Sequence, residues 1–382
     1  MIYLDNASTT IVKQEIIEEM RPYFQEKFFN SESIYCGKEG IKTAIDKARK
    51  QVADMLHVEP EQIIFTSGGT EGNNMILNNA LASHYNIITD KGEHDSILNR
   101  LETCDNVYYT GSSVIGIGGN RIEEVLDKIP SVDRKQILVS IMHTSNETGI
   151  VNNIKSISEI CKTNNMKFHS DCVQALGFAD LNLQKLGVDY ATISGHKIHA
   201  PKGIGAVYIK DPTEFKPLIY GGTQQEFGLR GGTLNVPYIV AFGKACEISK
   251  NNLEKCQSSV RKLKNNFIQN MIYLLNGYKI LNLWHINANG DSKVLNIRFD
   301  GIDAQTLVLL CAEHGVIFSA GSACRSHESN ASPALLDIGL SENEARNSIR
   351  ISFSGYEEVN QITKATSIIA EQVNKLYFDR YN

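Results

Sequence analysis

Apolar and polar positions follow two different periods along the first half of the chain. Short apolar runs rich in β-branched residues predict buried strands, and longer segments with an apolar residue every three to four positions predict helices. The predicted strands are Ile63–Thr66, Asn86–Thr89, Gln136–Ile141, Met166–His169, Tyr190–Ser194 and Gly205–Ile209. The predicted helices are Lys13–Tyr23, Ile41–Leu56, Gly72–Ser83 and Ile154–Asn164. This alternation predicts an α/β fold in which helices cover both faces of a mostly parallel sheet.

The pattern changes near residue 240, where one or two long helices are expected from Tyr238 to about Leu275. The segments that follow have a mixed α+β pattern. Strands are predicted at Lys293–Phe299, Val316–Ser319 and Ser348–Phe353, and helices at Ala304–Glu313 and Asn360–Leu376. We therefore expect a second, smaller domain, and an extended arm over the first dozen residues, which lack a helical period.

Composition narrows the possible functions. The chain has 382 residues, 42% of them hydrophobic, and a net charge of −5 with no long block of one sign. A nucleic-acid or membrane-surface role therefore has no electrostatic support. The chain opens without a basic stretch followed by an apolar run and contains no run of about 18 apolar residues, so we expect neither a secretory signal nor a membrane span. The eight cysteines are scattered, which favours reduced thiols in a cytoplasmic protein over a disulfide framework.

The strongest chemical signal is Ser194-Gly195-His196-Lys197, a polar turn directly after a predicted strand. A lysine amine in this place can form an imine with an aldehyde cofactor. Ser194 and His196 can donate hydrogen bonds to a phosphate. A lysine in such a turn is more often an ordinary exposed residue, so Lys197 identifies no site by itself.

A second signal is Asp171, in the segment Phe168–Gln174. Enough residues for one helix and one strand separate Asp171 from Lys197, so we expect both at the same edge of the sheet. An aspartate there can pair with a pyridine nitrogen and keep it protonated, which makes the ring an electron sink. Gln174 can hydrogen-bond the ring hydroxyl. The alternative for Asp171 is a helix N-cap.

A third signal is the glycine turn within Thr66–Asn73, between a predicted strand and a predicted helix. Backbone N–H groups and the helix dipole can hold an anion there. The turn is not a Walker loop, because no Gly-Lys-Ser/Thr follows. The run Gly116–Gly119 lacks the spacing of a dinucleotide-binding loop and is interpreted as a turn.

Eight motifs follow one another along the chain: Asp5-Asn6-Ala7-Ser8-Thr9-Thr10, Ser67-Gly68-Gly69-Thr70-Glu71, Glu93-His94, Asn146-Glu147-Thr148-Gly149, Asp171 with Gln174, Ser194-Gly195-His196-Lys197, Arg230-Gly231-Gly232-Thr233-Leu234-Asn235 and Gly321-Ser322-Ala323-Cys324. Taken in this order, they resemble the motifs of the NifS/IscS-type cysteine desulfurases, which belong to the class V aminotransferase group of fold type I pyridoxal-phosphate enzymes. The resemblance covers nearly the whole chain.

The resemblance implies a fold and a cofactor. The fold is a mostly parallel seven-stranded sheet in a large domain, residues 13–250, with a small α+β domain made of residues 1–12 and 251–382. The cofactor is pyridoxal 5'-phosphate. Lys197 would form the imine, Asp171 would pair with the pyridinium and Gln174 with the ring oxygen. A homodimer is also implied, because Thr233 would reach the phosphate of the second subunit.

The resemblance assigns further roles around this ring. The phosphate would be held by Gly69, Thr70, Ser194 and His196. His94 would stack on the ring and relay protons; without the resemblance it would be a satisfied strand-end histidine. Asn146 and Arg350 would bind the substrate, since a guanidinium holds a carboxylate in bidentate fashion. Without the resemblance Arg350 would be a surface strand arginine.

Cys324 decides which reaction is expected. It lies among small and polar residues in a loop of about residues 319–333, which predicts a mobile and exposed thiol. Arg325 and His327 are candidates for lowering its pKa. The other cysteines lie mostly in apolar or helical settings, which is typical of packing residues.

The expected function is conversion of L-cysteine to L-alanine, with the sulfur taken up as a persulfide on Cys324. The persulfide would pass to an acceptor protein, for iron–sulfur cluster assembly or tRNA thiolation. Related alternatives are a selenocysteine lyase, a cysteine sulfinate desulfinase and another class V aminotransferase. An alternative of a different class is a catalytically idle partner in iron–sulfur assembly. No metal site is expected.

Two positions depart from the family pattern. Cys172 stands where alanine is usual, which places a second thiol near the expected cofactor. The segment Asn30–Cys36 lacks the proline and the histidine of the family's corresponding stretch, and this changes a region near the expected subunit interface.

Overall fold

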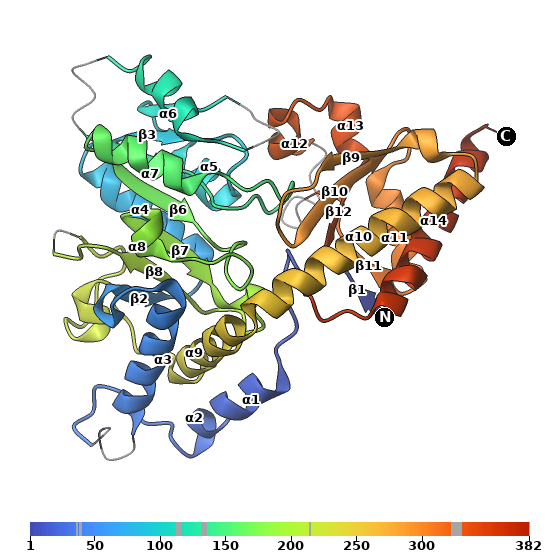
Figure 1. Cartoon of the computed structure of the whole chain (residues 1–382). Coiled ribbons are helices and arrows are strands. Elements are labelled where there is room, and N and C mark those ends of the chain that lie inside the picture. Colours follow the sequence, from blue (N-terminus) through green and yellow to red (C-terminus); the bar gives the residue numbers. More distant parts are fainter. Residues whose placement is uncertain are drawn as a thin grey trace.

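The computed structural model describes residues 1–35, 37, 40–111, 116–130, 136–213, 215–321 and 331–381, without the side chains of 379–381. Its centre is a seven-stranded sheet (Figure 1). In spatial order the strands are β2 (Ile63–Thr66), β8 (Gly205–Ile209), β7 (Tyr190–Ser194), β6 (Lys167–Asp171), β5 (Ile137–Ser140), β3 (Asn86–Thr89) and β4 (Val107–Tyr109). β8 runs antiparallel to both of its neighbours, β2 and β7, and the other pairs of this sheet are parallel. The predicted mostly parallel sheet is confirmed.

Both faces of this sheet are covered by helices, because neighbouring side chains along each strand point to opposite faces. Ile64 and Val207 pack with α4 (Gly69–Ala82) and α5 (Asp95–Leu101), whereas Ile63 and Tyr208 pack into the core of the opposite face. The helices of that opposite core are α1 (Gln14–Met20), α3 (Ile41–Leu56), α6 (Gly119–Leu126), α7 (Ile154–Thr163), α8 (Leu183–Leu186) and α9 (Val236–Asn251). The continuous apolar runs of the strands follow from burial on both faces.

Helix α3 illustrates how the pattern specifies an element. Its buried residues recur at helical spacing, with Ile41, Ile45, Ala48 and Val52 on one face. The observed bounds equal the predicted ones. The predicted helix Lys13–Tyr23 is instead divided into α1 (Gln14–Met20) and α2 (Pro22–Gln25), because Pro22 cannot continue the hydrogen-bond ladder.

The remaining residues build a smaller α+β part with a hydrophobic core of its own (Figure 1). Strand β10 (Val294–Phe299) lies between β9 (Trp284–Ala288) and β12 (Ser348–Ser352) and is antiparallel to both. The helices of this part are α10 (Leu253–Gly277), α11 (Ala304–Glu313), α12 (Pro333–Asp337), α13 (Glu342–Arg346) and α14 (Val359–Tyr381). The division into domains at residues 12 and 250 stays a prediction.

The chain begins in the smaller part and then runs to the larger sheet. β1 (Ile2–Tyr3) pairs in parallel with β11 (Val316–Ile317). β11 lies within the strand predicted at 316–319 and is shorter than it. Further along, the Thr10 backbone N–H donates to the carbonyl of His196 at 3.0 Å. The N-terminal segment is thus a non-helical arm, as predicted, with a turn at residues 6–8, and Ala7 and Ser8 line the pocket described below.

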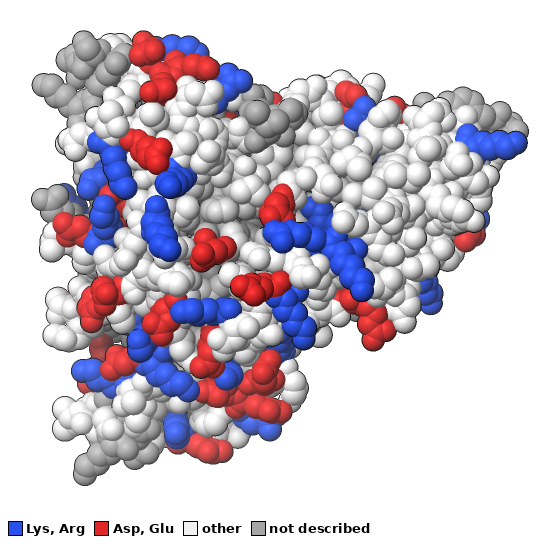
Figure 2. Space-filling view, viewed as in Figure 1, with Lys and Arg blue, Asp and Glu red and all other residues white. Residues whose placement is uncertain are grey.

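Charged side chains of both signs are interspersed on the face shown in Figure 2. They gather over the larger part, and the smaller part presents mostly uncharged surface in this view. Among the described helices, none combines the length and the apolar character needed to cross a membrane.

A buried ion pair fastens one loop to the sheet. Arg49 of α3 pairs with Glu226 at 2.6 Å, and both side chains are almost fully buried. The guanidinium also donates to the carbonyl of Ile63, and Glu226 accepts from the backbone N–H of Phe65. Glu226 lies in the short 3₁₀ helix η4 (Gln225–Gly228). The pair therefore fixes the segment that leads to Thr233 onto the edge strand β2.

Removal of one partner should be costly, because it leaves the other charge buried without compensation. We expect Arg49→Met to lower the free energy of unfolding by about 3–5 kcal/mol. Lys47→Met on the same helix is the control, since its ion pair with Glu19 is exposed and is worth at most about 1 kcal/mol. Thermal unfolding at matched protein concentration measures both. Equal shifts in the two variants would contradict the assigned role of the pair.

Candidate active site

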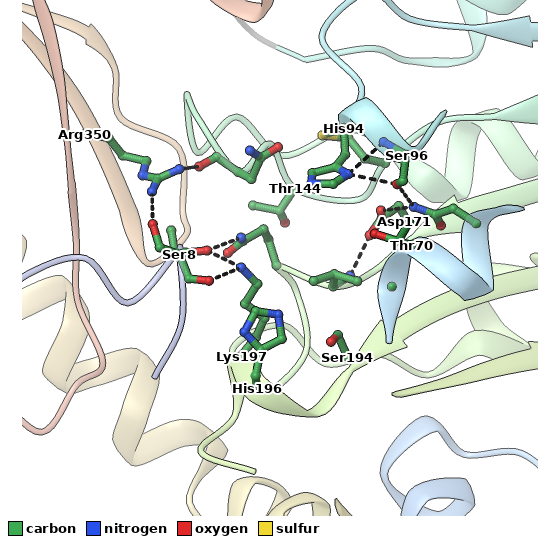
Figure 3. Close-up of a pocket in the computed structure, with 17 residues that line it drawn as sticks. Ser8, Thr70, His94, Ser96, Thr144, Asp171, Ser194, His196, Lys197 and Arg350 are labelled. Atoms are coloured by element: carbon green, nitrogen blue, oxygen red, sulfur yellow. Dashed lines mark hydrogen bonds between the residues drawn. The ribbon is translucent and has the colours of Figure 1, made fainter. Parts of the chain in front are cut away.

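One pocket of about 240 Å³ lies beyond the carboxyl ends of the parallel strands (Figure 3). The sequence-predicted residues that line it are Gly69, Thr70, His94, Asn146, Asp171, Gln174, Ser194, His196, Lys197 and Arg350. The lining residues that sequence reasoning did not select are Ala7, Ser8, Asn73, Ser96, Met142, Thr144 and Val173. Ligands of open α/β sheets bind at this edge, and the pocket is thus placed as the topology predicts.

Asp171 and Lys197 lie at the ends of two adjacent strands. Asp171 is the last residue of β6, which pairs in parallel with β7, and Lys197 follows β7 in the short 3₁₀ helix η3 (Gly195–Lys197). One Asp171 oxygen accepts from the backbone N–H of Val173 at 2.9 Å, and the other accepts from the Asn73 amide at 2.7 Å. Residues 173–178 form turns. Asp171 is therefore not the cap of a helix, the alternative that its position in the sequence allowed.

Lys197 is not an exposed loop residue either. Its side chain is half-buried, and its amine donates to the backbone carbonyl of Ala7 and, at 2.8 Å, to that of Ser8. Gln174 also donates to the carbonyl of Ala7, at 2.9 Å. The N-terminal segment and the strand ends thus share one polar network.

An anion-binding surface forms where α4 begins. The helix starts at Gly69, three residues earlier than predicted, with Gly68 as its N-cap. Gly72 lets α4 approach the sheet closely, because a Cβ atom there would lie 2.7 Å from the Thr192 side chain. Backbone N–H groups of the first turn and the hydroxyls of Thr70 and Ser194 consequently border the pocket.

His196 adds a neutral imidazole to this surface. Burial, together with the charges of Lys197 and Lys202, lowers the pKa of His196 to about 3. Its Nδ1 atom lies 3.2 Å from the Thr9 hydroxyl. The ring therefore carries no charge of its own near neutral pH and can hold an anion only as a neutral hydrogen-bond donor.

Arg350 enters the pocket from the other side, on β12. The residue is 1% exposed and is not the surface strand arginine that its position alone suggested. Its guanidinium donates to Asp5 at 2.9 Å, to the Ser8 hydroxyl at 2.6 Å and to the carbonyl of Asn146 at 2.9 Å. Its Nε atom is buried and has no hydrogen-bond partner among the described residues. A preformed guanidinium of this kind suits a ligand carboxylate.

His94 is the N-cap of α5, where its ring accepts a hydrogen bond from the backbone N–H of Ser96. It lines the pocket opposite Lys197 (Figure 3). The alternative interpretation, a strand-end histidine whose hydrogen bonds lie within its own turn, therefore holds for one side of the ring. The other side borders the cavity.

Two predicted site residues are not placed in the pocket. Thr233 is exposed and does not line it. Cys324 lies outside the described residues, as does the stretch 322–330 around it. The second thiol, Cys172, does not line the pocket, because this residue is 1% exposed and packs in the core. Burial raises the pKa of the Cys172 thiol to about 12, so the thiol stays protonated.

Comparison with known proteins identifies the family. The model of the class-V aminotransferase family matches residues 2–364. The chain belongs to the class-V aminotransferase family. The cysteine desulfurase IscS of Methanosarcina thermophila is 35% identical over 385 residues, which cover 98% of this chain and 92% of that protein. Within the family, the chain is thus of the NifS/IscS cysteine desulfurase type.

Solved structures agree with this family. A NifS-like protein superposes with a TM-score of 0.87 at 31% identity and covers 98% of this chain and 100% of its own. A structure described as SspA in complex with cysteine has a TM-score of 0.76 at 31% identity, covering 94% of this chain and 100% of its own. The expected fold type I architecture is confirmed by these neighbours.

The pocket of this class-V aminotransferase fits the pyridoxal phosphate that the resemblance implies. A carboxylate and a primary amine border one cavity, and a helix N-terminus with two hydroxyls borders it as well. The buried Oε1 atom of Gln174 has no hydrogen-bond partner among the described residues, which leaves a polar atom for a ligand hydroxyl. These donors and acceptors match an aldehyde, a pyridine ring and a phosphate.

The lining residues that were missed share a common reason. Ala7 and Ser8 belong to the motif Asp5–Thr10, whose place at the pocket became visible only with the course of the N-terminal segment. Asn73 and Ser96 follow motif residues by a few positions, on the first turns of α4 and α5. A helical projection that starts at Gly69 would have put Asn73 on the same face as the predicted anion site.

A cluster of buried carboxyl groups lies behind His94. Glu93 is fully buried, and burial raises its pKa well above the usual value. Asp90 accepts from the Gly92 backbone and from the Thr110 hydroxyl, both at 2.7 Å. Burial, and then the nearby charge of Asp337, raise the pKa of Asp90 to about 6.

The pKa of Asp90 predicts a pH-dependent stability. Asp90 binds its proton more readily in the folded chain than in the unfolded chain, where the pKa is about 3.8, so its ionisation costs stability as the pH rises through about 6. Asp90→Asn should therefore stabilise the protein on the order of 1–3 kcal/mol at pH 8. The gain should vanish toward pH 4. Thermal unfolding across this range measures it.

The control is Asp211→Asn, because hydrogen bonds from Thr213 lower the pKa of that exposed carboxylate. This variant should bring no gain at pH 8. A gain for Asp90→Asn that grows as the pH falls would contradict the account.

Proposed function

We propose that the chain converts L-cysteine to L-alanine and takes up the sulfur as a persulfide on Cys324. The observation that supports this most directly is one pocket bordered by Lys197, Asp171 and Arg350. An amine, a carboxylate and a guanidinium in this arrangement suit an amino-acid substrate bound beside an aldehyde cofactor.

The cofactor of the proposal is pyridoxal 5'-phosphate, which when bound supplies an electron sink that makes the Cα proton of cysteine acidic and weakens its Cβ–S bond. Lys197 would hold it covalently, and Asp171 would keep a positive charge on the ring nitrogen. Thr70, Ser194 and His196 would hold the phosphate together with the N-terminus of α4. Gln174 would reach the ring oxygen.

The chain's own side chains would orient the substrate and move its protons. Arg350 would bind the carboxylate of cysteine in bidentate fashion, with Asn146 beside it. The Lys197 amine would accept the proton from Cα, since Lys197 lines the pocket in which the substrate would bind. His94, on the opposite side of the pocket, would hold or return a proton there.

The sulfur step balances without an external oxidant. The Cys324 thiolate attacks the sulfur of the bound cysteine, so that an S–S bond forms and the Cβ–S bond breaks. The electron pair of the broken bond stays with Cβ, which takes up a proton and becomes the methyl group of alanine. Cys324 keeps the sulfur as a persulfide, and an acceptor thiol can attack and take over the outer sulfur atom.

A second copy of the chain is part of the proposal. Thr233 is exposed on its own subunit, as expected of a residue that completes the phosphate site of a partner. Exposed apolar side chains gather in the same region. They are Phe24, Phe28, Ile34, Tyr35, Tyr220 and Phe227. Gln225 contacts Glu32 at 3.3 Å, which joins the two stretches of chain that carry this patch. An apolar patch of this kind favours a homodimer interface.

The sulfur acceptor of the proposal is a protein, either an iron–sulfur scaffold or a relay in tRNA thiolation. The proposed location is the cytoplasm, where free thiols stay reduced. Six described cysteines are free, among them the buried Cys161, Cys172, Cys246 and Cys311, which agrees with a reducing compartment.

Replacement of the attacking thiol tests the function. Cys324→Ala should bind the cofactor and keep its visible absorption band, but its rate of alanine formation from cysteine should fall at least about a thousandfold, because no second thiol lines the described part of the pocket. Alanine release and sulfide release with a reductant measure the rate.

Cys104→Ala is the matched control, since Cys104 is half-buried and lies away from the pocket. It should turn over cysteine at the wild-type rate. Turnover of cysteine by Cys324→Ala at that rate would overturn the persulfide proposal. Turnover of selenocysteine or cysteine sulfinate, but not cysteine, by the wild type would favour the related lyase or desulfinase.

A further inference from the structure

Two groups of Ser96, its backbone N–H and its hydroxyl, contact the same nitrogen of His94. Its backbone N–H donates to His94 Nδ1 at 3.1 Å, and its hydroxyl oxygen lies 2.8 Å from the same atom. A backbone N–H can only donate, so Nδ1 is an acceptor and carries no proton. The single proton of a neutral imidazole is then on Nε2.

Asn73 sets the direction of the hydroxyl. Its amide nitrogen donates to Ser96 Oγ at 2.9 Å and to Asp171 Oδ2 at 2.7 Å (Figure 3). The reverse orientation of the amide would turn its carbonyl oxygen toward the Asp171 carboxylate, and two acceptors would face each other. Because Ser96 Oγ accepts from Asn73, its own hydrogen is left for His94 Nδ1. The donors therefore run in one direction, from Asn73 through Ser96 to His94.

This chain is buried and built on rigid elements. Asn73 is 1% exposed and lies on the first turns of α4, and Ser96 is 8% exposed and lies on the first turn of α5. A protonated Nδ1 would point an N–H group at the N–H of Ser96 and lose that hydrogen bond, and the Ser96 hydroxyl, which already accepts from Asn73, would have to accept a second one. In such a buried setting, water cannot replace a hydrogen bond that is lost.

We propose that Asn73 and Ser96 are positioning residues that hold His94 neutral with its proton on Nε2, so that the ring meets ligands in the pocket as a hydrogen-bond donor. This role rests on the proposed function in one respect, since the ligands are taken to be the cofactor and cysteine. A neutral ring also avoids repulsion with the positive charge that Asp171 would keep on the cofactor nitrogen.

The surrounding charges are compatible with this state. Across the pocket lie Lys197 and Arg350, which disfavour a second cation, and Asp171, which favours one but is separated from the ring by Asn73 and Ser96. Glu93 precedes His94 in the chain, and burial raises the pKa of its carboxyl group well above the usual value. Asp95 follows His94 as the first residue of α5. The direction of the hydrogen bonds from Asn73 through Ser96 therefore determines which nitrogen of His94 carries the proton.

Ser96→Ala is the sharper variant, because it removes the hydroxyl donor and leaves both Asp171 and the backbone N–H of residue 96 in place. Asn73 contacts Asp171 directly, so its replacement would change two groups at once. With one of two donors lost, the fraction of His94 that is protonated at a given pH should rise about five- to tenfold. Ser96→Thr keeps the hydroxyl and should restore the wild-type behaviour.

The measurement is ¹⁵N NMR of the holoenzyme with labelled histidine, in which His94→Gln identifies the His94 ring signals. In the wild type at about pH 7, Nδ1 should have the shift of an unprotonated nitrogen and Nε2 that of an N–H nitrogen. In Ser96→Ala, the titration of His94 should move to higher pH. The acid limb of the pH profile of alanine formation should move with it.

Two results would overturn the proposal. One is a protonated Nδ1 in the wild type at about pH 7, and the other is a His94 titration that is equal in wild type and Ser96→Ala. Neither readout depends on turnover. A chain without desulfurase activity but with the expected ring signals would refute the proposed function and leave the positioning role in place.

Discussion

The parallel pairing of β6 with β7 is the constraint on which the site depends. It fixes Asp171 and the turn that carries Lys197 at one edge of the sheet, because parallel neighbours end on the same side. A carboxylate and an amine that are distant in sequence consequently border one cavity. The same edge receives the N-terminus of α4, which needs Gly72 to approach β7. A shift of one residue in this register would turn Asp171 to the opposite face.

The N-terminal segment connects the two cores of the molecule. Ile2 and Leu4 belong to the core of the smaller part, whereas Ala7 and Ser8 accept hydrogen bonds from Lys197 on the larger sheet. Arg350 pairs with Asp5 and Ser8 on the same segment. Arg350 and Lys197 thus both contact residues 5–8, so a ligand that displaces this segment would act on both side chains.

Much of the fold could be predicted because its strands are buried on both faces. Continuous apolar runs such as Ile63–Thr66 and Tyr190–Ser194 gave the correct bounds. The short edge strand Val107–Tyr109 was missed, since its residues are only partly buried and carry little pattern. Site residues within motifs, such as Asp171 and Lys197, could be selected by chemistry. Asn73 and Ser96 could not, because their role follows from contacts between α4 and α5 that no local pattern encodes.

The central claim is that one aldehyde cofactor is tethered to Lys197 beside Asp171. The most direct measurement is reduction of the purified protein with borohydride, followed by digestion and peptide mass spectrometry. The peptide that contains Lys197 should carry a pyridoxyl phosphate group, and Lys197→Ala should lose it. A group on another lysine, or no group in protein purified with pyridoxal phosphate present, would contradict it.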